Sequence, residues 1–309
     1  MSAIRTEGLR KTYGSVVGLH GLDLDVRPQT VFGFLGPNGA GKTTTLRLLA
    51  GLSRPTAGQA WIADVPVGLE SLARKMVGYL PEEPRFYPWM TAAEFLGVYV
   101  GGLFGMDRRQ GRQRAAELLE RVGLQDVARR RIGGFSRGMR QRLGLAQALI
   151  NDPQVLLLDE PVSALDPGGR RDMLEWIGQL KSQHTVFMST HILEDVERIC
   201  DTIGVLNHGS LVIVEDRGTL LSRYAVPGME VEFQAEAQSV ATWAEAARRE
   251  PGVLAVEVEG TAAYLRLDGD AHTGPRVQAL VLGSGLVVQR FLVARPTLED
   301  VFLHLVETP

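Results

Sequence analysis

Cysteine is almost absent from this chain: among 309 residues, Cys200 is the only one. A single cysteine cannot form an internal disulfide, so the fold must be held together by noncovalent packing. This usage fits a reducing compartment. The neighbouring Val196 and Ile199 indicate that Cys200 lies on a packed helix and is not a reactive thiol.

Hydrophobic runs long enough to cross a bilayer are also missing. The best candidate, residues 95–104, is about half of the roughly 20 residues required, and Glu94 precedes it. The first residues, 1–5, lack the pattern of a signal peptide. If the chain serves a membrane pathway, we therefore expect that pathway to be a separate chain.

The chain carries no strong charge of either sign. Its net charge is −3 and its pI is near 6.1, which gives no sign of a nucleic-acid partner. The basic cluster 129–131 is too short to change this and is interpreted as a solvated turn. Hydrophobic residues make up 45% of the chain, enough for a sizeable core, and the length suits one large domain plus a small one.

A phosphate-binding loop is the most informative motif that is present. The pattern G-x-x-x-x-G-K-[ST] is met by Gly36, Pro37, Asn38, Gly39, Ala40, Gly41, Lys42 and Thr43, with Thr44 following. Glycines let the backbone N–H groups turn toward an anion, Lys42 reaches the β- and γ-phosphates, and the Thr43 hydroxyl can ligate Mg²⁺. A buried strand is predicted before the loop and a helix after it, and these flanks disfavour a chance match.

A second segment, residues 155–160, is an apolar run that ends in two carboxylates. Such a run is typical of a central parallel strand buried on both faces. Asp159 would hold Mg²⁺ directly or through water, and Glu160 would polarise the attacking water as general base. The alternative is a buried strand followed by two exposed loop acids, which the phosphate loop disfavours.

Two further segments place a polar residue where it could contact a bound anion. Ser136 is a good N-cap for the helix that follows it, so its hydroxyl and the free N–H groups form a second anion-binding end. An ordinary capped helix is the alternative. The β-rich run 186–190 leads into His191, for which a contact to the γ-phosphate is favoured over a purely structural role.

Together these residues resemble the nucleotide-binding subunit of ATP-binding cassette (ABC) transporters, over about the first 220 residues. The matching segments are the Walker A motif (36–43), the Walker B motif (155–160), the D-loop (163–166), the switch histidine (His191), the aromatic that stacks on adenine (Tyr13) and the family signature (136–141, including Ser136 and Gly138). The resemblance implies an α/β fold, a P-loop NTPase cassette with a RecA-like core and a helical subdomain at about 88–150. It also implies ATP and Mg²⁺ as cofactors.

The sequence departs from the usual family pattern at two places. The signature, usually L-S-G-G-Q, reads F-S-R-G-M over 135–139, and its added Arg137 is similar to variants of the ABC-2 exporter branch. The Q-loop glutamine is replaced by Glu82. Glu82 could still ligate Mg²⁺, but as an anion it adds negative charge beside the γ-phosphate unless metal or a proton offsets it.

Residues 221–309 lie outside the cassette and predict a small α+β domain. Their pattern is β-α-β-β-α-β, which indicates a ferredoxin-like module, with strands at 228–233, 252–258, 263–267 and 286–293 and helices at 240–249 and 275–282. This ending resembles the C-terminal extension of many ABC-2 drug and antibiotic exporters. An accessory role in dimerisation or regulation is a hypothesis.

The resemblance also implies the partners. Two copies would pair head to tail, with each ATP between Walker A of one copy and the signature of the other. A separate transmembrane permease would dock on the aromatic segment 82–90 by helix-in-groove recognition, which implies a cytoplasmic protein, peripheral on the inner face of the cell membrane. The alternative interpretation of residues 86–89 is a hydrophobic cluster that caps the next helix.

Two other functions compete with an exporter ATPase. A soluble ABC ATPase that acts on ribosomes or nucleic acid usually has two cassettes or long coiled-coil insertions, and this chain has neither. A nucleotide sensor without catalysis is disfavoured because Lys42, Asp159, Glu160 and His191 are all present. Import remains an alternative to export, and the transported substrate cannot be named from this chain.

Overall fold

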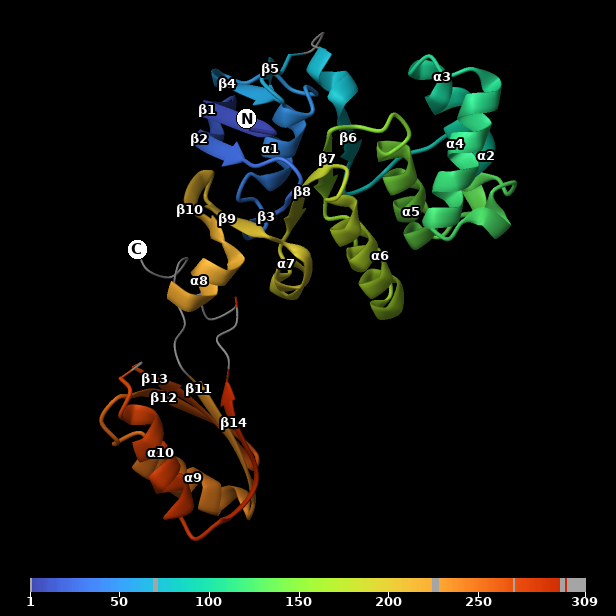
Figure 1. Cartoon of the computed structure of the whole chain (residues 1–309). Coiled ribbons are helices and arrows are strands. Elements are labelled where there is room, and N and C mark those ends of the chain that lie inside the picture. The colour runs from blue at the N-terminus through green and yellow to red at the C-terminus, as the bar shows by residue number, and fades with distance from the viewer. Residues whose placement is uncertain (1, 69–71, 224–227, 269, 295–297, 299–309) are drawn as a thin grey trace. The chain divides into compact units, whose positions relative to one another are not determined.

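A computed structural model describes residues 2–68, 72–223, 228–268, 270–294 and 298 (Figure 1). The chain divides into two compact units, Met1–Arg217 and Gly218–Pro309. Each unit has its own hydrophobic core and is described separately.

The larger unit is built on a six-stranded sheet with the order β10-β9-β3-β8-β7-β6. Its strands are β3 (Val31–Leu35), β6 (Val77–Leu80), β7 (Val155–Asp159), β8 (Thr185–Thr190), β9 (Thr202–Asn207) and β10 (Ser210–Asp216). Neighbouring strands are parallel except for β9 and β10. The central strands β3, β7 and β8 are buried throughout, as continuous apolar runs in a parallel sheet require.

The register of the central strands aligns their carboxyl ends. Leu35 of β3 pairs with Thr190 of β8, and Asp159 of β7 pairs with Ser189 of β8. Beneath these ends, the ring of Phe187 stacks on that of Phe32 with centroids 5.1 Å apart. The segments that follow the three strands therefore emerge side by side at one edge of the sheet, where ligands bind in open α/β folds.

A second, antiparallel sheet has the order β2-β1-β4-β5. It consists of β1 (Ile4–Tyr13), β2 (Val16–Val26), β4 (Ala57–Ile62) and β5 (Val65–Pro66). Residues 21–26 of β2 alternate with a period of two: Leu22, Leu24 and Val26 are buried, and the residues between them are exposed. The hairpin between β1 and β2 carries Tyr13 to its turn.

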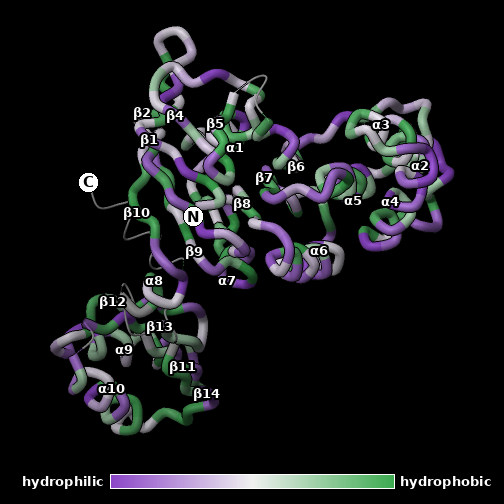
Figure 2. Tube along the Cα trace, turned by 45° about the horizontal axis from the view of Figure 1, so that its top comes forward, coloured by the Kyte–Doolittle hydropathy of each residue, from purple (hydrophilic) through white to green (hydrophobic). Residues whose placement is uncertain are grey.

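Helices surround the core sheet and form most of region 88–150. They are α1 (Lys42–Leu49), the 3-10 helix η1 (Leu72–Met76), α2 (Ala92–Glu94), the π-helix η2 (Phe95–Val100), α3 (Gly101–Leu103), α4 (Arg108–Arg121), the 3-10 helices η3 (Gln125–Val127) and η4 (Ile132–Gly134), α5 (Arg137–Ala148), α6 (Pro167–Leu180) and α7 (Leu193–Ile199). The outward-facing charges of α4 make it largely hydrophilic (Figure 2). No helix in the described part of the chain reaches the length and hydropathy that a bilayer crossing requires.

The smaller unit has the order of elements that the sequence predicts. After α8 (Arg217–Arg223) come β11 (Gly228–Gln234), α9 (Ala237–Ala247), β12 (Val253–Glu259), β13 (Ala262–Leu267), α10 (Thr273–Leu282) and β14 (Val287–Ala294). The sheet is antiparallel with the order β12-β13-β11-β14, a ferredoxin-like arrangement. Its core includes Phe233 of β11, whose ring packs edge-on against Trp243 of α9.

The close packing of β6 against the end of α5 predicts a stability effect at Gly78. A Cβ placed on Gly78 would lie 1.9 Å from the carbonyl oxygen of Ala148, so the backbone must move to admit a methyl group. We expect Gly78→Ala to lower the free energy of unfolding by about 2 kcal/mol, measured by urea denaturation. Gly102→Ala is the control, because nothing lies within 4 Å of that position; an equal loss in both variants would contradict the prediction.

Candidate nucleotide-binding site

The loop between β3 and α1 has a backbone that only glycine fits at several positions. Gly39 and Gly41 have φ values of 83° and 109°, in the left-handed region that other residues adopt at a cost. A Cβ on Gly36 would lie 2.2 Å from the carbonyl oxygen of Leu206. The loop is thereby shaped to leave the first N–H groups of α1 free for an anion.

Lys42, the first residue of α1, lies inside this loop. Its Nζ donates hydrogen bonds to the carbonyl oxygens of Gly36, at 2.6 Å, and Pro37, at 3.2 Å. Burial lowers the pKa of Lys42, while the nearby carboxylates of Glu160, Asp159 and Glu82 act in the opposite direction. The site therefore holds a partly desolvated cation where an anion would be bound.

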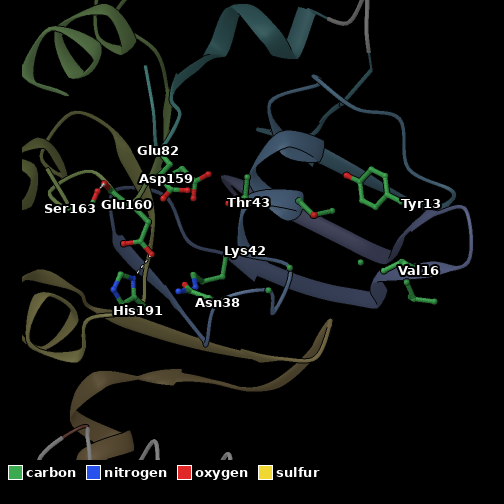
Figure 3. Close-up of a pocket in the computed structure, with 15 residues that line it drawn as sticks. Tyr13, Val16, Asn38, Lys42, Thr43, Glu82, Asp159, Glu160, Ser163 and His191 are labelled. Carbon is green, nitrogen blue, oxygen red and sulfur yellow. Dashed lines mark hydrogen bonds and ion pairs between the residues drawn. The ribbon is translucent and has the colours of Figure 1, made fainter. Parts of the chain in front are cut away.

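A pocket of about 460 Å³ opens beside the loop, within the size range of ligand sites. Tyr13 and Val16 lie at one end of this pocket and Glu160 and His191 at the other, with Lys42 between them (Figure 3). The sequence-predicted residues that line it are Tyr13, Asn38, Gly39, Gly41, Lys42, Thr43, Thr44, Glu82, Asp159, Glu160 and His191. The pocket therefore gathers residues from the loop, from β1 and from the ends of β6, β7 and β8.

Asp159 ends β7 and is buried, with 1% of its surface exposed. Its Oδ1 accepts a hydrogen bond from Ser189 Oγ at 2.6 Å, whereas its Oδ2 is buried and has no hydrogen-bond partner in the described part of the protein. An unpartnered buried carboxylate oxygen is costly unless a cation or donor meets it. With the Thr43 hydroxyl and Glu82 lining the same pocket, this donor set fits Mg²⁺, which prefers oxygen ligands together with substrate phosphates.

Glu160 follows Asp159 in an uncommon backbone conformation, with φ 48°. Its side chain is largely buried, and its Oε1 lies 2.8 Å from Nδ1 of His191. The His191 side chain is about half exposed and faces the pocket. A carboxylate held by an imidazole at the edge of a pocket can accept a proton from a water molecule bound there.

Ser136 and Gly138 are not among the residues that line this pocket. The Oγ of Ser136 accepts a hydrogen bond from the N–H of Met139 at 3.1 Å and caps α5, as the sequence predicts. A Cβ on Gly138 would lie 3.2 Å from Leu165 Cδ2, so the start of α5 packs against the D-loop. In one chain, the predicted anion-binding end of α5 and the pocket are therefore two separate features.

The sequence assigned no individual role to several residues at the site. Ser189 bonds Asp159, and Gln141 of α5 donates from Nε2 to the carbonyl oxygen of Glu160 at 3.3 Å. Residues 16–18 extend the pocket beyond Tyr13. A polar residue within the buried run 185–190 was a usable signal for Ser189. Gln141 closes the signature segment 136–141, but nothing in that segment indicates that its side chain reaches Glu160.

Comparisons with known proteins agree on one family. The family model for the ABC transporter matches residues 19–163, and that for the C-terminal domain of DrrA1-3-like ATP-binding proteins matches residues 222–306. The ABC transporter ATP-binding protein YxlF of Bacillus subtilis is 39% identical over 97% of this chain and 98% of its own length. The Nod factor export ATP-binding protein I of Rhizobium sp. (strain N33) is 36% identical over 98% and 96%.

Solved structures agree with this result. A dimeric post-hydrolysis state of the ATP-binding cassette MJ0796, bound to ADP and Pi, superposes with a TM-score of 0.64 at 25% identity. The match covers 69% of this chain and 98% of that cassette. The fold predicted from the sequence, a P-loop cassette, is thus confirmed, and the chain belongs to the ATP-binding proteins of ABC transporters, a family of nucleotide-binding ATPases.

Proposed function

We propose that this ATPase drives an exporter through a separate membrane permease, and that two copies of the chain close head to tail around ATP. The proposal rests on one observation: the predicted site residues of one chain lie in two separate places. One chain gathers Lys42, Asp159, Glu160 and His191 in its pocket, while the capped end of α5 lies outside it. A second copy would bring its Ser136 and Gly138 to the open side of the pocket.

The residues of the pocket have distinct roles in this mechanism. Tyr13 stacks on the adenine, and the loop N–H groups and Lys42 hold the phosphates. Thr43 and Asp159, with Glu82, hold Mg²⁺; when bound, the ion neutralises charge on the phosphate oxygens. Glu160 accepts the proton of the water that attacks the γ-phosphorus, as the bond from the γ-phosphorus to the β–γ bridging oxygen breaks, and His191 keeps the carboxylate directed at that water.

The second copy supplies stabilisation in trans. The Ser136 hydroxyl and the N-terminus of α5 present hydrogen-bond donors and partial positive charge, which favour the charge on the γ-phosphate. Binding then joins the copies and hydrolysis releases them. The dimeric state of the related cassette bound to ADP and Pi supports this arrangement.

An aromatic cluster is the proposed docking site for the permease. The ring centroid of Tyr87 lies 5.1 Å from that of Trp89 and 5.2 Å from that of Tyr99, and the tilted ring of Phe95 lies 6.5 Å away. Trp89 is 65% exposed. Exposed aromatic rings in a cluster favour a short helix of a protein partner.

Export and the accessory domain rest on the comparisons. The relative named for Nod factor export is similar over nearly its whole length, which supports export and disfavours a soluble ATPase acting on ribosomes or nucleic acid. The unit division at residue 217 and the separate family match at 222–306 support a cassette at 1–220 and an accessory domain at 221–309. Its role in dimerisation or regulation stays a prediction.

The general-base role predicts that Glu160→Gln traps the ATP-bound dimer. Without the carboxylate we expect ATPase activity to fall at least about a hundredfold, while size-exclusion chromatography with ATP shows a stable dimer. Glu175→Gln, which removes only a surface ion pair with Arg198, is the control. A monomeric variant that hydrolyses ATP freely would contradict the role.

The hydrogen bond from Ser189 to Asp159 predicts a change in metal affinity. Ser189→Ala frees the carboxylate to rotate, so the Mg²⁺ concentration for half-maximal ATPase activity should rise about tenfold. Ser182→Ala is the matched control, since among the residues that the structure describes the Oγ of Ser182 bonds only the Gln179 carbonyl oxygen. An unchanged Mg²⁺ dependence in Ser189→Ala would rule out this support.

The docking proposal predicts that Tyr87→Ala or Trp89→Ala uncouples transport. Each variant should lose the co-purifying permease from its own membranes yet keep most of the ATPase activity of the isolated chain. Tyr264→Ala, an exposed aromatic of the smaller unit, serves as control. Loss of basal ATPase in folded variants would count against a docking role.

A further inference from the structure

Gln141 makes a buried contact that the mechanism above does not use. It lies on α5 with only 2% of its surface exposed, and its Nε2 donates to the carbonyl oxygen of Glu160 at 3.3 Å. Burial of an amide group without a hydrogen bond is unfavourable, so the buried side chain of Gln141 needs a hydrogen-bond partner. The contact joins the signature helix to the backbone of the proposed general base in the same chain.

The backbone that Gln141 holds is in an unfavourable conformation. Glu160 has φ 48°, and Pro161 follows it, which restricts the residue before it further. Such conformations persist where the surrounding structure over-determines them, and they concentrate at active sites. The geometry at Glu160 therefore depends on the hydrogen bonds made by the two peptide groups beside it.

Those hydrogen bonds come from three elements. The carbonyl oxygen of Glu160 accepts from Ser163, through its N–H at 3.3 Å and its Oγ at 3.1 Å, as well as from Gln141. The N–H of Glu160 donates to the carbonyl oxygen and the Oγ of Ser189, at 3.2 and 3.3 Å. Ser163 and Ser189 hold the residue from the D-loop and from β8, and Gln141 is the one that holds it from α5.

The same helix carries the end that would meet the ATP of the second copy. Ser136 caps α5, and Gly138 at its first turn packs against Leu165 of the D-loop. Five residues of helix, about 7.5 Å, separate Ser136 from Gln141. A displacement of α5 at its capped end would therefore reach the Glu160 peptide through a single rigid element.

We propose that Gln141 is a positioning residue that fixes the left-handed conformation of Glu160 and so links the direction of this carboxylate to the placement of the signature helix. The inference rests on the proposed role of Glu160 as general base. In this arrangement, the α5 end of one chain contacts the nucleotide bound to the second copy. That contact sets the direction of Glu160 in the first chain, which acts on the first chain's own nucleotide. The two sites of the dimer are thereby coupled through one side-chain hydrogen bond in each chain.

The test is steady-state ATP hydrolysis by the full chain carrying Gln141→Leu, which keeps the volume and removes the donor. Loss of one neutral hydrogen bond predicts a three- to tenfold fall in kcat, with unchanged KM for ATP and unchanged Tm. Gln147→Leu is the matched control: the same substitution on the same helix, at a residue whose side chain makes no contact with Glu160 in the described structure. Gln141→Met, which keeps an unbranched side chain, replaces the leucine variant if that one fails to fold.

A double-mutant cycle with Ser163→Ala separates positioning from packing. Because both side chains hold one carbonyl oxygen, the combined fall in kcat should exceed the product of the single effects. A kcat equal to that of the unmutated chain, a rise in KM alone, or a loss of activity that follows a loss of Tm would each overturn the proposal. Full activity of Glu160→Gln would instead refute the proposed function, whereas an inactive Glu160→Gln beside a fully active Gln141→Leu would refute this inference alone.

Discussion

The parallel pairing of β3, β8 and β7 is the constraint on which the site depends. Because these strands are in register, the phosphate loop, His191 and the two carboxylates of Asp159 and Glu160 leave the sheet at the same edge. The apolar side chains along the strands, with the stacked rings of Phe32 and Phe187, fix that register from within the core. A polar cluster that could not stabilise itself is thus held by burial of residues that take no part in the chemistry.

This edge of the sheet holds several groups that lower the stability of the folded chain. It contains a partly desolvated lysine, a buried carboxylate oxygen that finds no partner among the described residues, and a glutamate in the left-handed region. Each of these features is unfavourable for the isolated chain, and each would be relieved or used when a metal-bound nucleotide enters. The groups that lower the stability of the folded chain are therefore the same groups that are proposed to bind and turn over the ligand.

Much of this site could be predicted from the sequence because its parts are local. The loop at 36–43 has its spacing within eight residues. Asp159 ends a recognisable strand, and Glu160 and His191 each come directly after one. The order of elements in the smaller unit was predicted for the same reason, since alternation and turn residues indicate strands and helices one at a time. The order of strands within each sheet was not predicted, because it depends on crossover connections between distant segments.

The contacts that support the site could not be predicted from the sequence. Gln141 and Glu160 are 19 residues apart, and Ser189 and Asp159 are 30 apart, so only the folded chain brings them together. Tyr13 as an adenine platform came from the family resemblance, and residues 16–18 beside it appeared only in the pocket. Sequence patterns thus identified the groups proposed to meet the nucleotide and missed those that hold them.

The central claim is that a complete site requires two chains, and a mixing experiment tests it most directly. A Lys42→Met chain lacks the lysine proposed to bind the phosphates, and a Ser136→Arg chain lacks the residue proposed to act in trans. Each chain alone should be nearly inactive, whereas a mixture should regain ATPase activity, because the mixed dimer pairs an intact Lys42 with an intact Ser136. A mixture that forms dimers with ATP but stays inactive, or a Ser136→Arg chain that is fully active alone, would contradict the account.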